Sequence, residues 1–216
     1  MNLETARTQM LGQQIRAWDV FDERVLEALR ETPRERFVPP AYRELAFADM
    51  EIPLGRGQCM LAPKVEGRLL QALRLENSDS VLEVGTGSGY LTACLARLAG
   101  RVHSIDIFSD FQAGAETKLR EQRIANVKLA EKDALGLDAT TKFDVIAVTG
   151  SVPVLDEHFV HMLAPAGRLF IVVGRAPVME ARLITMHSNG QWTQESLFET
   201  VLTALVNAEQ PEPFVL

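Results

Sequence analysis

Residues Val81 to Tyr90 read Val-Leu-Glu-Val-Gly-Thr-Gly-Ser-Gly-Tyr, and this stretch decides the fold. A run of β-forming residues leads into three glycines at alternate positions, Gly85, Gly87 and Gly89, and apolar residues at helical spacing follow over 91–98. The pattern predicts a strand, a tight turn and a helix. Glycine permits positive φ and the close approach of a ligand, and the start of a helix offers free N–H groups. We therefore expect a small molecule to bind on this turn.

The spacing of the glycines indicates which class of ligand binds on the turn. A dinucleotide-binding turn places its third glycine three residues after the second, where this chain has Tyr90. Gly-x-Gly-x-Gly after an acid instead resembles the first motif of class I S-adenosylmethionine (AdoMet)-dependent methyltransferases. A second apolar strand over 102–105 ends at Asp106, about twenty residues after the first glycine, where nucleotide folds place a ribose-binding carboxylate. The alternatives are a glycine turn that only packs helix on sheet and a nicotinamide cofactor. The expected AdoMet-binding residues of this region are Glu83, Gly85, Thr86, Gly87, Ser88, Gly89 and Asp106.

Composition bounds the class of protein. The 216 residues are 47% hydrophobic, which suits one domain with a substantial core, and no apolar run is long enough to span a membrane. The net charge of −7 argues against non-specific nucleic-acid binding. The N-terminus lacks the features of a signal peptide, and we expect Cys59 and Cys94 to be free thiols in a reducing cytoplasm. The sequence leaves the oligomeric state open.

Periodicity divides the expected single domain, 1–216, into two parts. Residues 1–76 read as an N-terminal helical cap, with helices over 3–31 broken near Trp18, followed by an active-site loop over 46–63 that Pro and Gly interrupt. Residues 77–216 read as an AdoMet-binding α/β core with a mostly parallel sheet, helices on both faces and antiparallel strands at the C-terminal edge. Asp22 is the expected cap of the second helix. Further helices are expected at 65–75, 111–123 and 155–163, and strands at 81–84, 102–105, 127–130, 143–149, 168–173, 182–187 and 191–197, the last two joined by Asn189-Gly190.

Further motifs follow one another along the chain: Gln13–Arg16, Pro33–Pro39 (Pro-Arg-Glu-Arg-Phe-Val-Pro), Ile52–Gln58, Phe143–Thr149, Leu163–Leu169 and the tail Glu212–Leu216. Together with residues 81–90 they resemble one family, the protein-L-isoaspartate (D-aspartate) O-methyltransferases, over nearly the whole chain. The resemblance implies a Rossmann-like class I fold, AdoMet as cofactor, and methyl transfer to a carboxylate of isomerised aspartyl residues in a protein or peptide substrate, as in protein repair. It also implies that Asp133, after the third strand, accepts a hydrogen bond from the adenine amine; a solvated turn acid is the alternative.

One departure from the family concerns the acceptor site. The family has Thr-Ile-Ser-x-Pro where this chain has Cys59-Met60-Leu61-Ala62-Pro63, so Leu61 replaces the serine and Cys59 the threonine. The loss of the hydroxyls predicts weak or absent isoaspartyl turnover. It leaves open a different acceptor, such as a small molecule, or a non-catalytic AdoMet-binding protein. Lys64 is a candidate to compensate with its positive charge, and a solvated lysine is the alternative.

Polar residues after the fourth predicted strand are further candidates. Thr149 and Ser151 follow the apolar run that begins at Phe143, and ligands of open α/β sheets bind at the carboxyl ends of strands. Thr149 therefore joins Cys59 and Leu61 as a candidate active-site residue, although strand-end hydroxyls are as often turn groups. The four histidines show no metal-ligand spacing, and no metal is expected.

Overall fold

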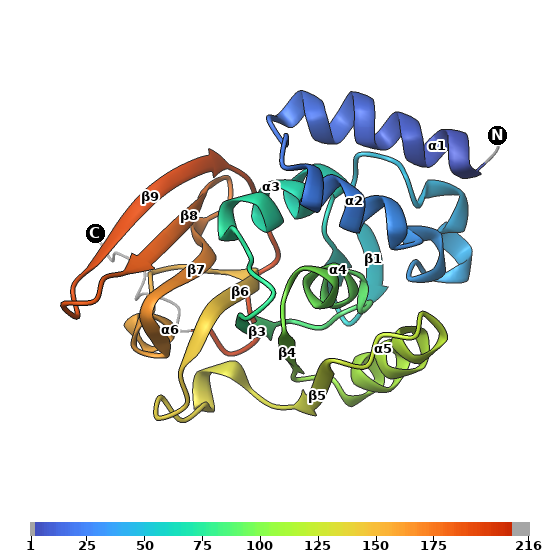
Figure 1. The fold of residues 1–216 in the computed structure, drawn as a ribbon. Coiled ribbons are helices and arrows are strands. Elements are labelled where there is room, and N and C mark those ends of the chain that lie inside the picture. The colour runs from blue at the N-terminus through green and yellow to red at the C-terminus, as the bar shows by residue number, and fades with distance from the viewer. Residues whose placement is uncertain (1–2, 209–216) are drawn as a thin grey trace, which may run out of the picture.

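A seven-stranded sheet forms the centre of the molecule in the computed structural model, which describes residues 3–208 (Figure 1). Its strand order is β5-β4-β3-β6-β7-β8-β9, parallel from β5 to β7 and antiparallel at β8 and β9. The expected mostly parallel sheet with an antiparallel C-terminal edge is confirmed. The tail motif 212–216 lies outside the described residues. The strands are β3 Ser80–Val84, β4 Arg101–Asp106, β5 Val127–Glu131, β6 Phe143–Val152, β7 Leu163–Arg175, β8 Val178–Met186 and β9 Trp192–Glu199.

Burial on both faces explains the unbroken apolar character of the central strands. All five residues of β3 are buried, and neighbouring residues Val81 and Leu82 belong to hydrophobic clusters on opposite faces of the sheet. The cluster that contains Val81 also includes Met10 and Leu26 from the N-terminal region. Residues of the described N-terminal region, from Ala6 onward, and residues of the sheet thus share one hydrophobic cluster.

Helices lie on both faces of the sheet, as expected. Four of them, α1 to α4, gather on one side, and α6 lies on the other (Figure 1). Asp22 caps α2 as predicted, since its carboxylate accepts a hydrogen bond from the Arg24 N–H at 2.8 Å. The expected helix over 155–163 is shorter, because β7 begins at Leu163. The helices are α1 Leu3–Gln9, continued by η1 Met10–Ile15 and η2 Arg16–Trp18, α2 Glu23–Glu31, η3 Arg34–Arg36, η4 Pro40–Leu45, α3 Pro63–Leu73, α4 Tyr90–Leu98, α5 Ser109–Glu121, η5 Ala134–Gly136 and α6 Glu157–His161.

The stretch expected as a loop over 46–63 contains a β-hairpin. Strands β1 (Ile52–Gly55) and β2 (Gln58–Met60) pair antiparallel, with Ile52 opposite Met60. Arg56 and Gly57, at the turn, both have positive φ, of 54° and 72°. The prediction of an irregular loop was wrong because Pro53 and the two glycines hide the period of such short strands, although these residues are compatible with an isolated two-stranded pair.

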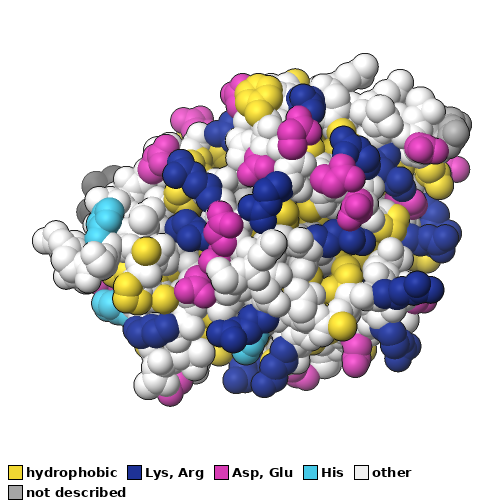
Figure 2. All heavy atoms as spheres, in the orientation of Figure 1, with side chains coloured by type: hydrophobic (Ala, Val, Ile, Leu, Met, Phe, Trp, Pro, Cys, Tyr) yellow, Lys and Arg dark blue, Asp and Glu magenta, His cyan; other side chains and the backbone are white. Residues whose placement is uncertain are grey.

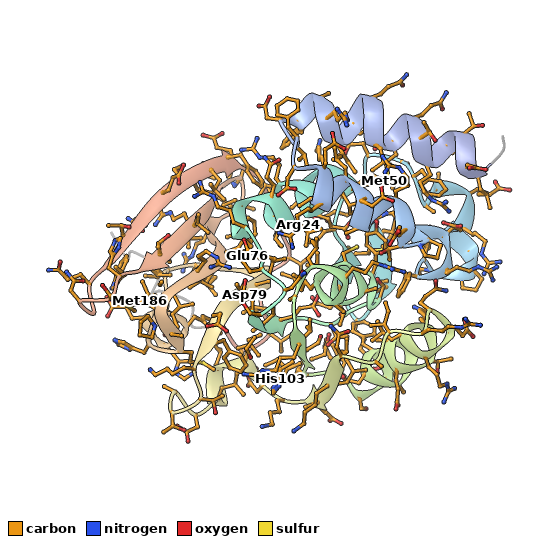
Figure 3. All side chains as sticks on the ribbon, in the orientation of Figure 1. Arg24, Met50, Glu76, Asp79, His103 and Met186 are labelled. Carbon is orange, nitrogen blue, oxygen red and sulfur yellow. The ribbon has the colours of Figure 1, made fainter. Side chains whose placement is uncertain are left out.

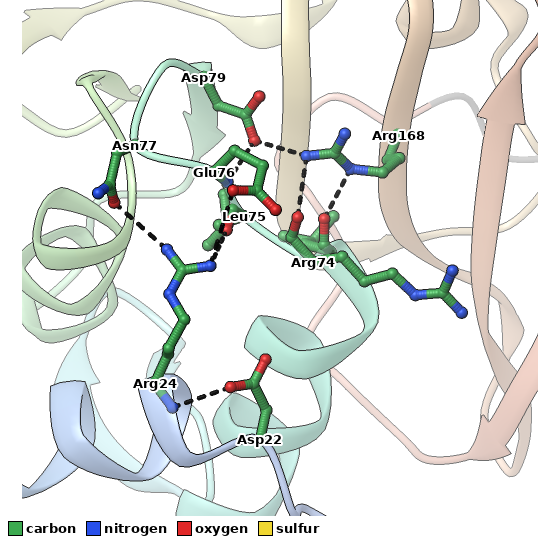
Figure 4. A network of polar contacts seen from close by, with 9 residues as sticks. Asp22, Arg24, Arg74, Leu75, Glu76, Asn77, Asp79 and Arg168 are labelled. Atoms are coloured by element: carbon green, nitrogen blue, oxygen red, sulfur yellow. Dashed lines mark hydrogen bonds and ion pairs between the residues drawn. The ribbon is translucent and has the colours of Figure 1, made fainter.

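Two arginines tie the helical region to the sheet. Figure 3 shows Arg24, Glu76 and Asp79 close together, and Figure 4 shows their contacts. Arg168 of β7 forms an ion pair with Asp79 at 2.5 Å and donates to the Leu73 carbonyl at the end of α3. Arg24 of α2 donates to the Leu75 carbonyl at 2.8 Å. These contacts fix the turn that leads into β3.

The surface carries both charges. Lys and Arg side chains alternate with Asp and Glu side chains across the face in Figure 2. Within residues 3–208, no helix is long and apolar enough to cross a membrane.

Candidate functional site

A pocket opens at the carboxyl ends of β3, β4 and β6, beneath the β1–β2 hairpin. The parallel strands end there together, so groups far apart in the sequence meet. Its far wall comes from the segment after β9, around Thr203 and Leu205. The predicted site residues that line it are Cys59, Leu61, Gly85, Gly87, Asp106, Asp133 and Thr149.

Asp106 is held rigidly at the end of β4. It is 7% exposed, and its carboxylate accepts hydrogen bonds from the N–H of Gly87 at 2.9 Å and of Phe108 at 3.0 Å. Burial raises the pKa of Asp106, and the N–H donors oppose that rise. The side chain therefore shapes the glycine turn and also faces the pocket, with further acceptor lone pairs for a ligand hydroxyl.

The glycines of the turn have different roles. A Cβ on Gly85 would lie 2.2 Å from the Thr149 hydroxyl, which donates to the Val84 and Gly85 carbonyls at 2.9 and 3.0 Å. Gly87 has φ of 50° and lines the pocket. Gly89 lies outside the pocket lining, and its Cβ would lie 2.9 Å from the Cβ of Ala115, so it permits α4 and α5 to pack closely.

Two hydroxyls of the turn face a smaller adjoining pocket. Thr86 and Ser88 line it together with Cys59 and Leu61. The Thr86 hydroxyl also contacts the Ser104 hydroxyl at 2.6 Å, and the Ser88 hydroxyl accepts from the Tyr90 N–H at the start of α4. These hydroxyls are therefore partly engaged in holding the turn.

Glu83 lies behind the turn, outside the lining of both pockets. It is fully buried and accepts hydrogen bonds from the Thr92 hydroxyl at 2.5 Å and the Ser104 hydroxyl at 2.6 Å. Burial raises its pKa to about 8, and the two hydroxyls oppose that rise. The structure thus places Glu83 beneath the turn, where it holds hydroxyls of α4 and β4.

Asp133 and Ser151 differ in their access to the pocket. Asp133 caps η5 by accepting from the Leu135 N–H at 3.0 Å, accepts from the Asn207 amide at 2.8 Å, and also lines the pocket. Asp133 therefore caps a turn and faces the pocket at the same time. Ser151 is fully buried, donates to the Leu202 carbonyl at 3.0 Å, and does not line the pocket.

The hairpin brings Cys59 and Leu61 to the pocket. Leu61 is 7% exposed, and Cys59 is half-buried, with its pKa raised by burial and by the Glu51 charge. Lys64 does not line the pocket, because it forms an ion pair with Asp49 at 2.8 Å and lies over the Trp18 ring.

A buried arginine binds the backbone on both sides of the hairpin. Arg34 is 1% exposed and donates to the Leu61 carbonyl at 2.6 Å and the Ala46 carbonyl at 2.8 Å. It also pairs with the buried Glu66, whose pKa burial raises and the guanidinium lowers. The backbone of the position that carries the family serine is therefore fixed by an arginine 27 residues earlier in the chain.

Other lining residues were missed by sequence reasoning. Phe108 and Phe111 stand two and five residues after Asp106, so their position after the β4 acid was a usable signal. No sequence signal pointed to Glu51 or to the segment 203–206. The hairpin brings Glu51 to the pocket, and the return of the chain after β9 brings 203–206 there. Among residues 3–208, no group of His, Cys, Asp and Glu is arranged to hold a metal ion.

Known proteins with similar sequences and structures indicate the family of the chain. Residues 5–210 match the family model described as protein-L-isoaspartate(D-aspartate) O-methyltransferase. The chain is 35% identical over 211 residues to protein-L-isoaspartate O-methyltransferase 2 of Pelobacter propionicus, covering 96% of this chain and 93% of that protein. It is 32% identical over 205 residues to protein-L-isoaspartate O-methyltransferase of Aliivibrio salmonicida, covering 94% of this chain and 98% of that protein. A Plasmodium falciparum protein-L-isoaspartate O-methyltransferase structure in complex with S-adenosyl-L-homocysteine has the same fold, with a TM-score of 0.79, 21% identity, and coverage of 95% and 98%.

Proposed function

Because the chain belongs to the protein-L-isoaspartate(D-aspartate) O-methyltransferase family and is an AdoMet-dependent methyltransferase, we propose that it methylates the free carboxylate of isomerised aspartyl residues in proteins or peptides. The main support for the proposal is that a single pocket is lined both by residues suited to the cofactor and by residues suited to the methyl acceptor. The glycine turn and Asp106 form its cofactor side, and the hairpin with Cys59 and Leu61 forms its acceptor side.

The cofactor side fits AdoMet. Gly85 and Gly87 present their backbone to the pocket, and the Asp106 carboxylate offers acceptors for the two ribose hydroxyls. Asp133 lines the same pocket and offers an acceptor for the adenine amine, while Phe108 supplies an apolar wall. We assign cofactor contacts to these residues, and to Glu83 and Gly89 a supporting role beneath the turn.

Positioning is the main catalytic contribution of the protein. AdoMet supplies a methyl carbon activated by its positive sulfur. A carboxylate acceptor has a pKa near 4 and is already ionised at pH 7, so the chain needs no general base. The hairpin has to hold the acceptor in line and exclude water, and good orientation supplies roughly 7–11 kcal/mol in favourable cases. Leu61 excludes water but offers no hydrogen bond, so we expect slow turnover.

The two free thiols, Cys59 and Cys94, support the expectation that the protein works in the cytoplasm.

The test is transfer of labelled methyl groups from AdoMet to an isoaspartyl peptide, beside an unfractionated cell extract. Label in the isoaspartyl peptide supports the proposal. Label only in extract components would indicate a different acceptor, and AdoMet binding without any transfer would indicate a non-catalytic binding protein.

A further inference from the structure

Glu51 is a carboxylate at the acceptor side of the pocket. It immediately precedes β1, whose pairing with β2 ends at Ile52 opposite Met60, and its charge acts on Cys59 of β2. Glu51 is half-buried and lines the pocket together with Cys59 and Leu61. A negative charge therefore lies beside the position where the acceptor is expected.

The cations around the hairpin are already paired with other carboxylates. Lys64 pairs with Asp49 at 2.8 Å, and Arg56 pairs with Asp110 at 3.0 Å. Within the described part of the chain, no basic side chain forms an ion pair with Glu51.

The pocket itself supplies little positive charge on this side. Lys132, the one cation among its described lining residues, directly follows β5 at the edge of the seven-stranded sheet and precedes Asp133. Burial raises the pKa of Glu51, which is the expected response of a carboxylate without a compensating charge.

We propose that Glu51 selects acceptors that carry a positive charge next to the methylated residue, such as a lysine or arginine flanking an isoaspartyl residue. This inference rests on the proposed function. Two carboxylates brought together in a partly dehydrated pocket repel each other, and a flanking cation offsets the repulsion by pairing with Glu51. A flanking acid adds a third negative charge and increases it.

The experiment compares three isoaspartyl peptides that differ only in the residues on both sides of the isomerised aspartate, which are lysine, alanine or glutamate. For the wild type, we expect kcat/KM to be roughly 3- to 30-fold higher for the lysine peptide than for the glutamate peptide, a range that corresponds to about one or two opposite-charge contacts. Added salt should reduce this preference.

The decisive variant is Glu51→Gln, which keeps the shape of the side chain and removes its charge. We expect it to lower kcat/KM for the lysine peptide and to raise it for the glutamate peptide, so that the preference falls at least threefold. The matched control is Glu44→Gln, which removes one negative charge from an exposed residue outside the pocket lining. This control should keep the wild-type order.

Two results would overturn the inference. The first is an unchanged preference in Glu51→Gln, and the second is an equal fall for all three peptides, which would indicate a structural role. The affinity for S-adenosylhomocysteine should also stay unchanged, since a loss there would assign Glu51 to the cofactor instead.

Failure of the proposed function gives a different result. If the wild type methylates none of the peptides, the proposed function fails. The affinities of the same peptides in the presence of S-adenosylhomocysteine then decide the role of Glu51, and binding that is absent or independent of Glu51 would refute it.

Discussion

Removing the Asp106 carboxylate should damage the cofactor site in two separable ways. In the protein alone, Asp106→Ala leaves the N–H groups of Gly87 and Phe108 without the acceptor that now lies 2.9 and 3.0 Å away. Each hydrogen bond to a charged group contributes about 1.5–3 kcal/mol, and water entering from the pocket replaces part of that. We therefore expect a loss of about 1–3 kcal/mol in the free energy of unfolding.

The second effect is on cofactor affinity. If Asp106 holds the ribose hydroxyls, its loss costs about 1.5–3 kcal/mol of binding free energy, which raises Kd about 10- to 100-fold. Asp106→Asn keeps the size of the side chain and one acceptor oxygen. It should therefore reduce the free energy of unfolding less than it reduces the affinity for S-adenosylhomocysteine. The assay is calorimetric titration with S-adenosylhomocysteine, combined with denaturant unfolding of the free protein. Asp138→Ala, at an exposed acid outside the pocket lining, is the control. Unchanged affinity in folded Asp106→Ala would refute the assignment.

Four further predictions concern the turn, the hairpin and the interior. Gly87→Val should weaken S-adenosylhomocysteine binding at least tenfold by calorimetry, because its φ of 50° disfavours a branched side chain and its Cβ would lie 3.1 Å from Leu54 Cδ1, which lines the same pocket; normal binding would contradict this. Amide exchange across residues 52–60 should slow when the cofactor binds, and equal exchange with and without it would exclude closure of the hairpin. Burial raises the pKa of Glu83 from 4.5 to about 8, so the folded state binds more protons between those values, and stability should fall as pH rises through that window. In Glu83→Gln, the free energy of unfolding should fall less between pH 5 and pH 8 than in the wild type, by on the order of a few kcal/mol. Parallel pH profiles of unfolding free energy for the two proteins would count against a neutral Glu83. Leu61→Ser, alone or with Cys59→Thr, should raise isoaspartyl methyl transfer at least tenfold, whereas robust wild-type turnover would show that leucine is a neutral replacement.

Local patterns predicted the elements that depend on local chemistry. The strand-turn-helix around Gly87, the acid at the end of β4 and the hairpin at Asn189-Gly190 all follow from period and turn residues, and the structure contains each of them. The β1–β2 hairpin did not follow, because its strands are too short to show a period and Pro53 opposes a strand assignment.

Long-range contacts set the features that the sequence did not reveal. Arg34, in the motif Pro33–Pro39, is buried because Glu66, 32 residues later, and two backbone carbonyls satisfy its guanidinium. Glu83 was expected to contact the cofactor, and its burial depends on hydroxyls from α4 and β4. Such partners become visible only once the chain has folded.

The chemical identity of the methylated group tests the central claim most directly. Wild-type protein is incubated with methyl-labelled AdoMet and with equal amounts of the isoaspartyl and aspartyl forms of one peptide, and base-labile label is measured in each. We expect label in the isoaspartyl form alone, as a methyl ester whose hydrolysis in mild base releases labelled methanol. Equal labelling of both forms, or label that resists base, would contradict it.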